Sequence, residues 1–274
     1  MSFLALHIDP MGHVKDSYLF SGWGGEFGKF GQALGHYGFT KQIALYALAG
    51  LLTVTIFLLR ARRVRTEQVP RGFGNMLEVV MLYIRDNVAR PFLGDHCEKF
   101  LPFLWSLFFF ILISNLLGLV PLFDYLGHGG NTPTGSIFLT AALALSAFVI
   151  YHTLGVIEQG HGIWGYIKSL FPHVPVVILP IIVPVELIGV IVKPCALAIR
   201  LFANMLAGHV MLATIIAFTG VWTTLIHWGA GISLVVYLGC VALTFLELMV
   251  ALIQAFVFTF LTTVFLAAAV HPEH

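Results

Sequence analysis

Long uncharged stretches alternate with short polar segments along this chain. Residues 43–59, 100–123 and 136–157 are apolar and 17 to 24 residues long. A helix rises about 1.5 Å per residue, so stretches of this length cross a hydrocarbon core of about 30 Å. The pattern therefore predicts three membrane-crossing helices before residue 160.

The apolar stretches near the end of the chain are longer than one crossing requires. Four prolines crowd the start of the fourth stretch: Pro175, Pro180, Pro184 and Pro194. Residues 195–219 and 232–270 contain no proline, and 232–270 would be roughly 60 Å long as one helix, about twice the hydrocarbon thickness. We predict that 232–270 is a single kinked or strongly tilted helix, joined to the fourth by a turn at 220–231.

A different pattern occupies residues 73–99. Apolar residues there are mixed with charged ones, namely Glu78, Arg85, Asp86 and Arg90. Such a mixture favours an amphipathic helix at the membrane interface over a crossing. The predicted fold is an all-α polytopic membrane protein with about five crossings and one amphipathic interfacial helix. Its last two helices form a long, strongly tilted hairpin.

Positive charge orients the predicted crossings. Four arginines follow the first of them: Arg60, Arg62, Arg63 and Arg65. Such an excess marks the cytoplasmic side of a membrane. We therefore predict a polar leader on the outer (periplasmic) side at 1–42, one integral membrane domain at 43–270, and a cytoplasmic tail at 271–274.

Composition agrees with a membrane protein and excludes several functions. The chain is 59% hydrophobic and 10% charged, whereas soluble domains are about 45–50% apolar and about 25% charged. A net charge of +1 gives no excess of positive charge that would bind nucleic acid. No nucleotide-binding motif occurs, and the three cysteines lack metal-ligand spacing. We expect no cofactor, no metal and no direct nucleotide binding.

The few charged residues within the apolar stretches are candidates for function. Each costs about 2.5–3.5 kcal/mol on insertion scales, so it needs a specific role. Arg200 has no acidic residue within ten positions on either side, and Glu186, Lys193 and Arg200 recur at intervals of seven. Glu247 and Gln254 are also seven apart on the facing helix. A buried carboxylate, like a histidine, can take up and release a proton near neutral pH, and a proton relay requires such a group.

Purely structural roles remain open for some of these residues. Arg200 could extend its charge to the interface or pair with a carboxylate elsewhere in the bundle. Asn204 and Gln254 could serve as hydrogen-bonding contacts between helices.

Three ordered motifs resemble one family. They are KPCALAIRLFANMLAGH at 193–209, ELMVALIQAFVF at 247–258 and FLWSLFFFILISNLLGLVP at 103–121. Together they resemble subunit a of the F-type ATP synthase, over roughly residues 70–270. The resemblance implies the stator subunit of the proton-driven rotary motor, with two aqueous half-channels that load and unload carboxylates on a rotor ring.

The resemblance also implies roles for individual residues. Arg200 matches the essential arginine that faces the ring, and Gln254 matches the glutamine close to it. His209 and Glu247 match the pair in the half-channel open to the outer side. Many bacterial members have an acid at the position of His209 and a histidine at that of Glu247, so the order is exchanged here.

The rest of the implied proton path is polar. Asn115 and Asn204 would contribute on the outer side, and Glu186 and Lys193 near the opposite half-channel. The implied partners are a ring of c subunits, peripheral-stalk b subunits, the lipid bilayer and, indirectly, the F1 sector. The expected location is the bacterial inner (plasma) membrane as a multi-pass protein, in preference to the mitochondrial inner membrane. The competing hypothesis is a stand-alone secondary proton or cation transporter.

Overall fold

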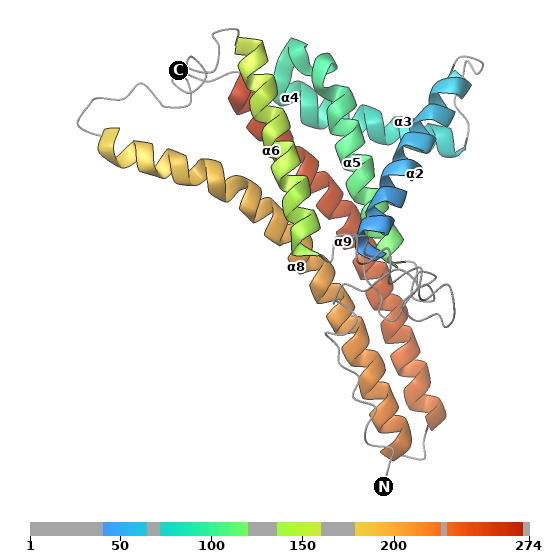
Figure 1. Cartoon of the computed structure of the whole chain (residues 1–274). Helices are drawn as coiled ribbons and strands as arrows, with labels where there is room; N and C mark the ends of the chain where they lie inside the picture. Colours follow the sequence, from blue (N-terminus) through green and yellow to red (C-terminus); the bar gives the residue numbers. More distant parts are fainter. Residues whose placement is uncertain (1–40, 65–71, 120–135, 160–178, 226–228, 271–274) are drawn as a thin grey trace, which may run out of the picture. The chain divides into compact units, whose positions relative to one another are not determined.

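A computed structural model describes residues 41–64, 72–119, 136–159, 179–225 and 229–270. Throughout these ranges the regular structure is helical, with no strand (Figure 1). Within them, the side chains of 179–187, 209 and 216–236 are among those not described. The predicted leader, the predicted tail and most of the polar connections fall outside the described residues.

Five of the helices are long and apolar enough to cross a membrane. They are α2 (Lys41–Val64), α5 (Cys97–Leu119), α6 (Ile137–Gln159), α8 (Leu179–Leu225) and α9 (Gly229–Val270). This finding confirms the predicted all-α class and the predicted number of crossings. The helix ends differ from the predicted ones by a few residues, since polar residues such as Arg60 and Arg62 extend helices beyond their apolar portions.

The segment predicted as one amphipathic helix is a series of short helical elements. It contains α3 (Phe73–Ile84), the π-helical turn η1 (Arg85–Ala89), α4 (Arg90–Leu93) and the 3₁₀ turn η2 (Gly94–His96). Gly94 has φ 55°, a left-handed conformation that a glycine adopts without strain, and it marks the break between α4 and α5. None of these elements is long enough to count as a crossing by length and composition.

The predicted turn at 220–231 is wrong in its extent. Helix α8 continues to Leu225 and α9 begins at Gly229, so only 226–228 separate them. Helix α8 also continues through Pro184 and Pro194. A bilayer core holds no water to satisfy freed backbone groups, so a helix there tends to continue where a soluble one would end.

The chain divides into two compact units that alternate along the sequence. The first unit comprises Met1–Leu51, Leu112–Thr140 and Arg200–Gln254, and the second comprises Leu52–Ile111, Ala141–Ile199 and Ala255–His274. Five long helices therefore each contribute one portion to each unit.

The second unit has an apolar core. Its buried members are Ala89, Leu93, Cys97, Phe100, Leu101, Leu104, Tyr151, Leu266, Ala269 and Val270. Aromatic pairs add to the packing of this unit, including Phe92 with Phe260 at 5.5 Å between ring centroids and Phe57 with Phe109 at 5.4 Å. Edge-to-face pairs of this kind hold helices in a defined register.

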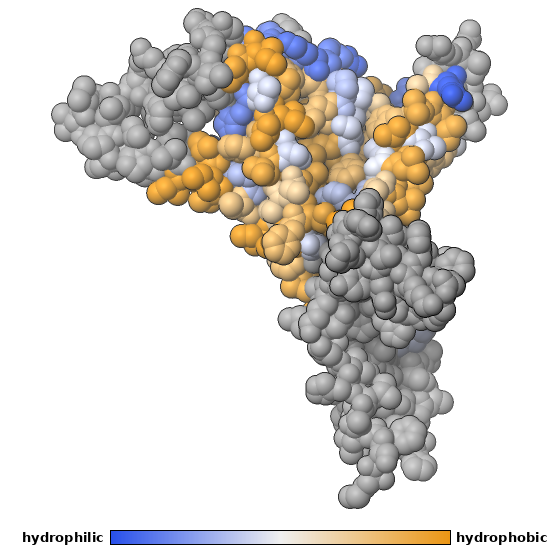
Figure 2. Space-filling view, viewed as in Figure 1, coloured by the Kyte–Doolittle hydropathy of each residue, from blue (hydrophilic) through white to orange (hydrophobic). Residues whose placement is uncertain are grey.

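Ion pairs gather at one end of the second unit. Lys99 pairs with Glu158, and Arg60 pairs with Glu78 at 2.8 Å. Figure 2 shows hydrophilic surface at this end, above helices whose visible sides are largely hydrophobic. This distribution suits a bundle with lipid around its middle and water at its end.

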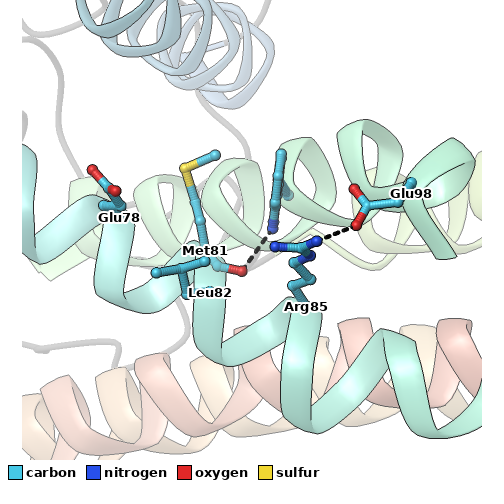
Figure 3. A pocket seen from close by; sticks show the side chains of 6 residues that line it. Glu78, Met81, Leu82, Arg85 and Glu98 are labelled. Atoms are coloured by element: carbon cyan, nitrogen blue, oxygen red, sulfur yellow. Dashed lines mark hydrogen bonds and ion pairs between the residues drawn. The ribbon is translucent and has the colours of Figure 1, made fainter. Parts of the chain in front are cut away.

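The π-helical turn η1 contributes a further ion pair to this unit. Arg85 at its start donates a hydrogen bond to Glu98, and this bond raises the pKa of the Arg85 guanidinium above its usual value. Trp105 Nε1 donates to the carbonyl oxygen of Met81 at 3.0 Å (Figure 3). Both bonds join the α3–η1 segment to α5 beside an open cavity of about 200 Å³.

Candidate functional site

The first unit brings part of α8 and part of α9 together as an antiparallel pair. Gly208 on α8 faces Glu247 on α9, and Leu201 lines the same cavity as Gln254. Figure 1 shows these two helix portions side by side. The predicted helical hairpin is therefore confirmed, whereas its tilt in the membrane stays a prediction.

A small cavity lies within this unit. It is lined by Asn115, Leu201, Asn204, Met205, Glu247, Val250, Ala251 and Gln254. Four of these residues are polar, and all four are among the predicted site residues. The cavity measures about 10 Å³, which is near the threshold for holding one water molecule. Three amide residues and one acidic residue thus line a cavity at the lower limit of the size that holds one water molecule.

Glu247 is the ionisable member of this group. Its side chain is half-buried, and its Oε1 atom is buried without a hydrogen-bond partner among the described residues. A buried carboxyl oxygen without a partner is costly, so it needs water, a proton or a neighbouring donor. Glu247 is therefore a candidate for proton exchange, as predicted from the sequence.

Sequence reasoning missed Gly208 as part of this site. A β-carbon placed on Gly208 would lie 2.5 Å from Glu247 Oε1 and 2.9 Å from its Cδ. The carboxyl group therefore occupies space that any other residue at 208 would fill. In the sequence, Gly208 is marked only by its position directly before His209. That position does not indicate which residue of another helix contacts Gly208.

Asn115 contributes from α5 and is 2% exposed. Its Nδ2 donates a long hydrogen bond of 3.4 Å to the carbonyl oxygen of Ala251 on α9. The preceding residue, Ser114, is fully buried, and its Oγ has no hydrogen-bond partner among the described residues. Asn115 thus ties α5 to the α9 wall of the cavity, whereas Ser114 adds an unsatisfied hydroxyl beside it.

Arg200 lies at the start of the first unit, directly before the cavity residue Leu201. Its side chain is exposed, and within the described part of the chain it makes no hydrogen bond and no ion pair. The suggested pairing with a carboxylate of the same bundle is therefore not found among the described side chains. A guanidinium carries its charge at any physiological pH, so Arg200 presents a fixed positive charge on a membrane-crossing helix.

The remaining predicted site residues are Lys193, Glu186 and His209. Lys193 belongs to the second unit, where its ammonium lies 5.5 Å from the centre of the Phe265 ring. Glu186 and His209 lie on α8, but their side chains are outside the described residues. Their predicted roles therefore stay predictions.

Comparison with known proteins identifies the family. Residues 43–267 match the model of the family described as ATP synthase A chain. The chain is 39% identical to ATP synthase subunit a of Myxococcus xanthus over 86% of this chain and 74% of that protein. It is 35% identical to ATP synthase subunit a of Maricaulis maris over 86% of this chain and 90% of that protein. The chain belongs to the ATP synthase subunit a family.

Family membership confirms the resemblance deduced from the three motifs. The matched region includes every wall residue of the cavity, together with Arg200, His209 and Gly208. A further subunit a, from Chlorobium phaeobacteroides, is 32% identical over 96% of this chain and 75% of that protein. These relatives are bacterial, and the five apolar helices agree with a multi-pass bacterial membrane protein.

Ser114 and Asn115 give opposite expectations for the stability of this ATP synthase subunit. Ser114→Ala removes an unpartnered buried hydroxyl and should leave stability unchanged or raise it by up to about 1 kcal/mol. Asn115→Ala removes the bond to Ala251 and enlarges the cavity, so it should cost about 1–2 kcal/mol. Thermal unfolding of the purified complex in detergent measures both. An equal loss in the two variants would contradict the hydrogen bonding described for this pair.

Proposed function

We propose that this chain is the proton-translocating stator subunit of an F-type ATP synthase. In this proposal two aqueous half-channels, neither of which crosses the membrane, load and unload protons on carboxylates of a rotor ring. The observation that carries the proposal is the polar cluster of the last two crossing helices and α5: a carboxyl oxygen and a nearby arginine, both without a partner among the described residues, and three amides. Family membership supports the same conclusion.

Glu247 and His209 form the proton-accepting unit of the outer half-channel in this proposal. The cavity at Glu247 has room for one water, and the amides of Asn115, Asn204 and Gln254 can donate to or accept from that water. A proton passed from this unit neutralises a ring carboxylate. The neutral carboxyl group can then enter lipid at far lower cost than the charged form.

Arg200 separates the two half-channels. Its guanidinium is exposed and unpaired within the described part of the chain, so it is available to an acidic group of another subunit. It attracts the ionised ring carboxylate and, because it does not give up its proton, blocks a direct leak between the channels. Each unit charge that crosses gains about 2.3 kcal/mol per 100 mV, so several protons are needed for one ATP.

The opposite half-channel includes Glu186 and Lys193 in this proposal. A ring carboxylate that has made nearly a full turn releases its proton there. The partners are a ring of c subunits, peripheral-stalk b subunits and, through them, the F1 sector. The whole assembly lies in the bacterial inner membrane, with the domain order proposed from the sequence.

Replacement of Arg200 tests the proposal most directly. Arg200→Ala removes the fixed charge and should abolish ATP-driven acidification of inverted vesicles, while the complex still assembles. Arg90→Ala is the matched control, because Arg90 is exposed and, among the described residues, pairs only with Asp86 at 3.5 Å, one turn away. The control should pump normally. Normal acidification with Arg200→Ala would overturn the proposal.

Exchange of His209 and Glu247 tests whether these residues form one protonatable unit. His209→Glu places two carboxylates in a confined site, where repulsion traps a proton, and Glu247→His places two imidazoles together. The double exchange restores one acid and one base, so it should pump faster than either single variant. ATP-driven pumping of the four forms at matched assembly is the measurement. A double exchange no better than the worse single variant contradicts the pairing.

Thiol labelling tests the proposed orientation and domain order. The native cysteines Cys97, Cys195 and Cys240 are first replaced by alanine, because all three are free thiols. Gly24→Cys and Gly130→Cys should then react with an impermeant maleimide added from outside intact cells. His274→Cys should react only in inverted vesicles. Labelling of His274→Cys from outside would show that the number of crossings or their direction is wrong.

A further inference from the structure

A larger cavity lies in the second unit, among α3, η1 and α5, and the proposed proton path does not use it. It measures about 200 Å³ and is lined by Glu78, Met81, Leu82, Arg85, Glu98 and Trp105. That volume is several times the roughly 30 Å³ that one water molecule occupies in the liquid. The cavity is therefore large enough to hold a small polar group of a ligand.

The wall of this cavity carries charge of both signs. Arg85 donates to Oε1 of Glu98, and Oε2 of Glu78 accepts from Arg60 at 2.8 Å. A carboxylate accepts hydrogen bonds at both of its oxygens, so each glutamate has capacity for a further donor. The Glu98 and Glu78 side chains are 59% and 44% exposed, and Figure 3 shows them on either side of Arg85. A bound group can therefore meet one cation and two anions.

Arg85 has a buried donor atom without a partner. Its Nε makes no hydrogen bond to any described residue, whereas Nη2 donates to Glu98. A buried donor without an acceptor costs free energy, and a guanidinium binds phosphate through two parallel N–H groups. Arg85 also begins a π-helical turn, a rare conformation that occurs frequently at functional sites. These features suit Arg85 to binding a phosphate oxygen.

The position of the cavity suits the boundary between membrane and water. Its wall extends from Glu98, the second residue of the crossing helix α5, to Trp105, a rise of about 10 Å along a helix. Tryptophan is enriched at this boundary in membrane proteins. Leu82 of α3 lines the cavity and is exposed, and Val79 and Met76, about one and two turns earlier, are exposed as well. Apolar surface beside a charged cavity suits the acyl chains and the headgroup of one lipid.

We propose that this cavity binds the headgroup of phosphatidylethanolamine, with the phosphate at Arg85 and the ammonium at Glu78 and Glu98. A primary ammonium has three N–H donors, whereas choline has none, so phosphatidylcholine would offer the two carboxylates no hydrogen bond. Phosphatidylglycerol would place a negative charge beside two carboxylates with no ammonium to offset it. The inference does not rest on the proposed function, because no residue of this cavity belongs to the proposed proton path.

The test counts the lipids that the purified complex retains. The complex is reconstituted in nanodiscs that contain phosphatidylethanolamine, phosphatidylcholine and phosphatidylglycerol in equal amounts and with the same acyl chains. It is then transferred to detergent and washed, and the retained lipids are extracted and quantified by mass spectrometry. The wild-type complex should retain about one more phosphatidylethanolamine than a complex whose cavity is altered, with the other two lipids unchanged.

Two variants alter the cavity in independent ways. Arg85→Lys keeps the positive charge but removes the planar pair of N–H groups that binds phosphate. Leu82→Trp fills the cavity from an exposed position and leaves every charge in place. Each should lose about one phosphatidylethanolamine per complex. Arg90→Lys and Val79→Trp are the matched controls, because both positions are exposed and neither lines the cavity. The controls should retain the wild-type amount.

Each result supports or overturns the proposed site. Equal retention of phosphatidylethanolamine by all forms would overturn it, and so would a loss in only one of the two cavity variants when both assemble. An equal loss of all three lipids would also overturn it, because the cavity would then not select the headgroup. If Arg85→Lys does not assemble, the comparison of Leu82→Trp with Val79→Trp decides.

Discussion

The absence of water in a bilayer core is the constraint on which the rest of this structure depends. A backbone N–H or C=O group there has no bulk water to bond to and bonds mainly within its own helix, so helices continue where soluble helices would end. Helix α8 runs from Leu179 to Leu225 through two internal prolines, and α9 runs without interruption from Gly229 to Val270. The same constraint means that every polar side chain placed in the bilayer core on these helices costs free energy.

The arrangement of the polar groups in the first unit reflects this free-energy cost. Asn115 reaches across to a backbone carbonyl, and the amides of Asn204 and Gln254 share a small cavity with Glu247. The carboxyl oxygen of Glu247 and the guanidinium of Arg200 both lack a partner among the described residues. A carboxyl oxygen and a guanidinium that both lack partners within one hairpin are difficult to explain by helix packing alone. In the proposed function, their partners are a mobile proton and a carboxylate of the rotor ring.

Much of the site could be predicted because charged and amide residues are rare in the apolar stretches. Arg200, Glu247 and Gln254 stand out by that rarity alone, and the spacing of Glu247 and Gln254 places them on one side of a helix. That Asn115, from a helix more than a hundred residues earlier, completes the same cavity was implied only by resemblance to a family. No periodicity within one helix indicates which distant helix packs against it.

The sequence by itself determined the number of crossings, the all-α class, the family and the residues that carry charge into the membrane, because hydrophobicity and charge act locally along the chain. Tertiary structure alone decided that Gly208 faces Glu247, that Asn115 bonds to Ala251, and that Lys193 belongs to a different unit from Arg200 on the same helix. These are contacts between helices, and they depend on how two surfaces fit. A missing side chain matters only when the group that fills its space comes from elsewhere in the fold.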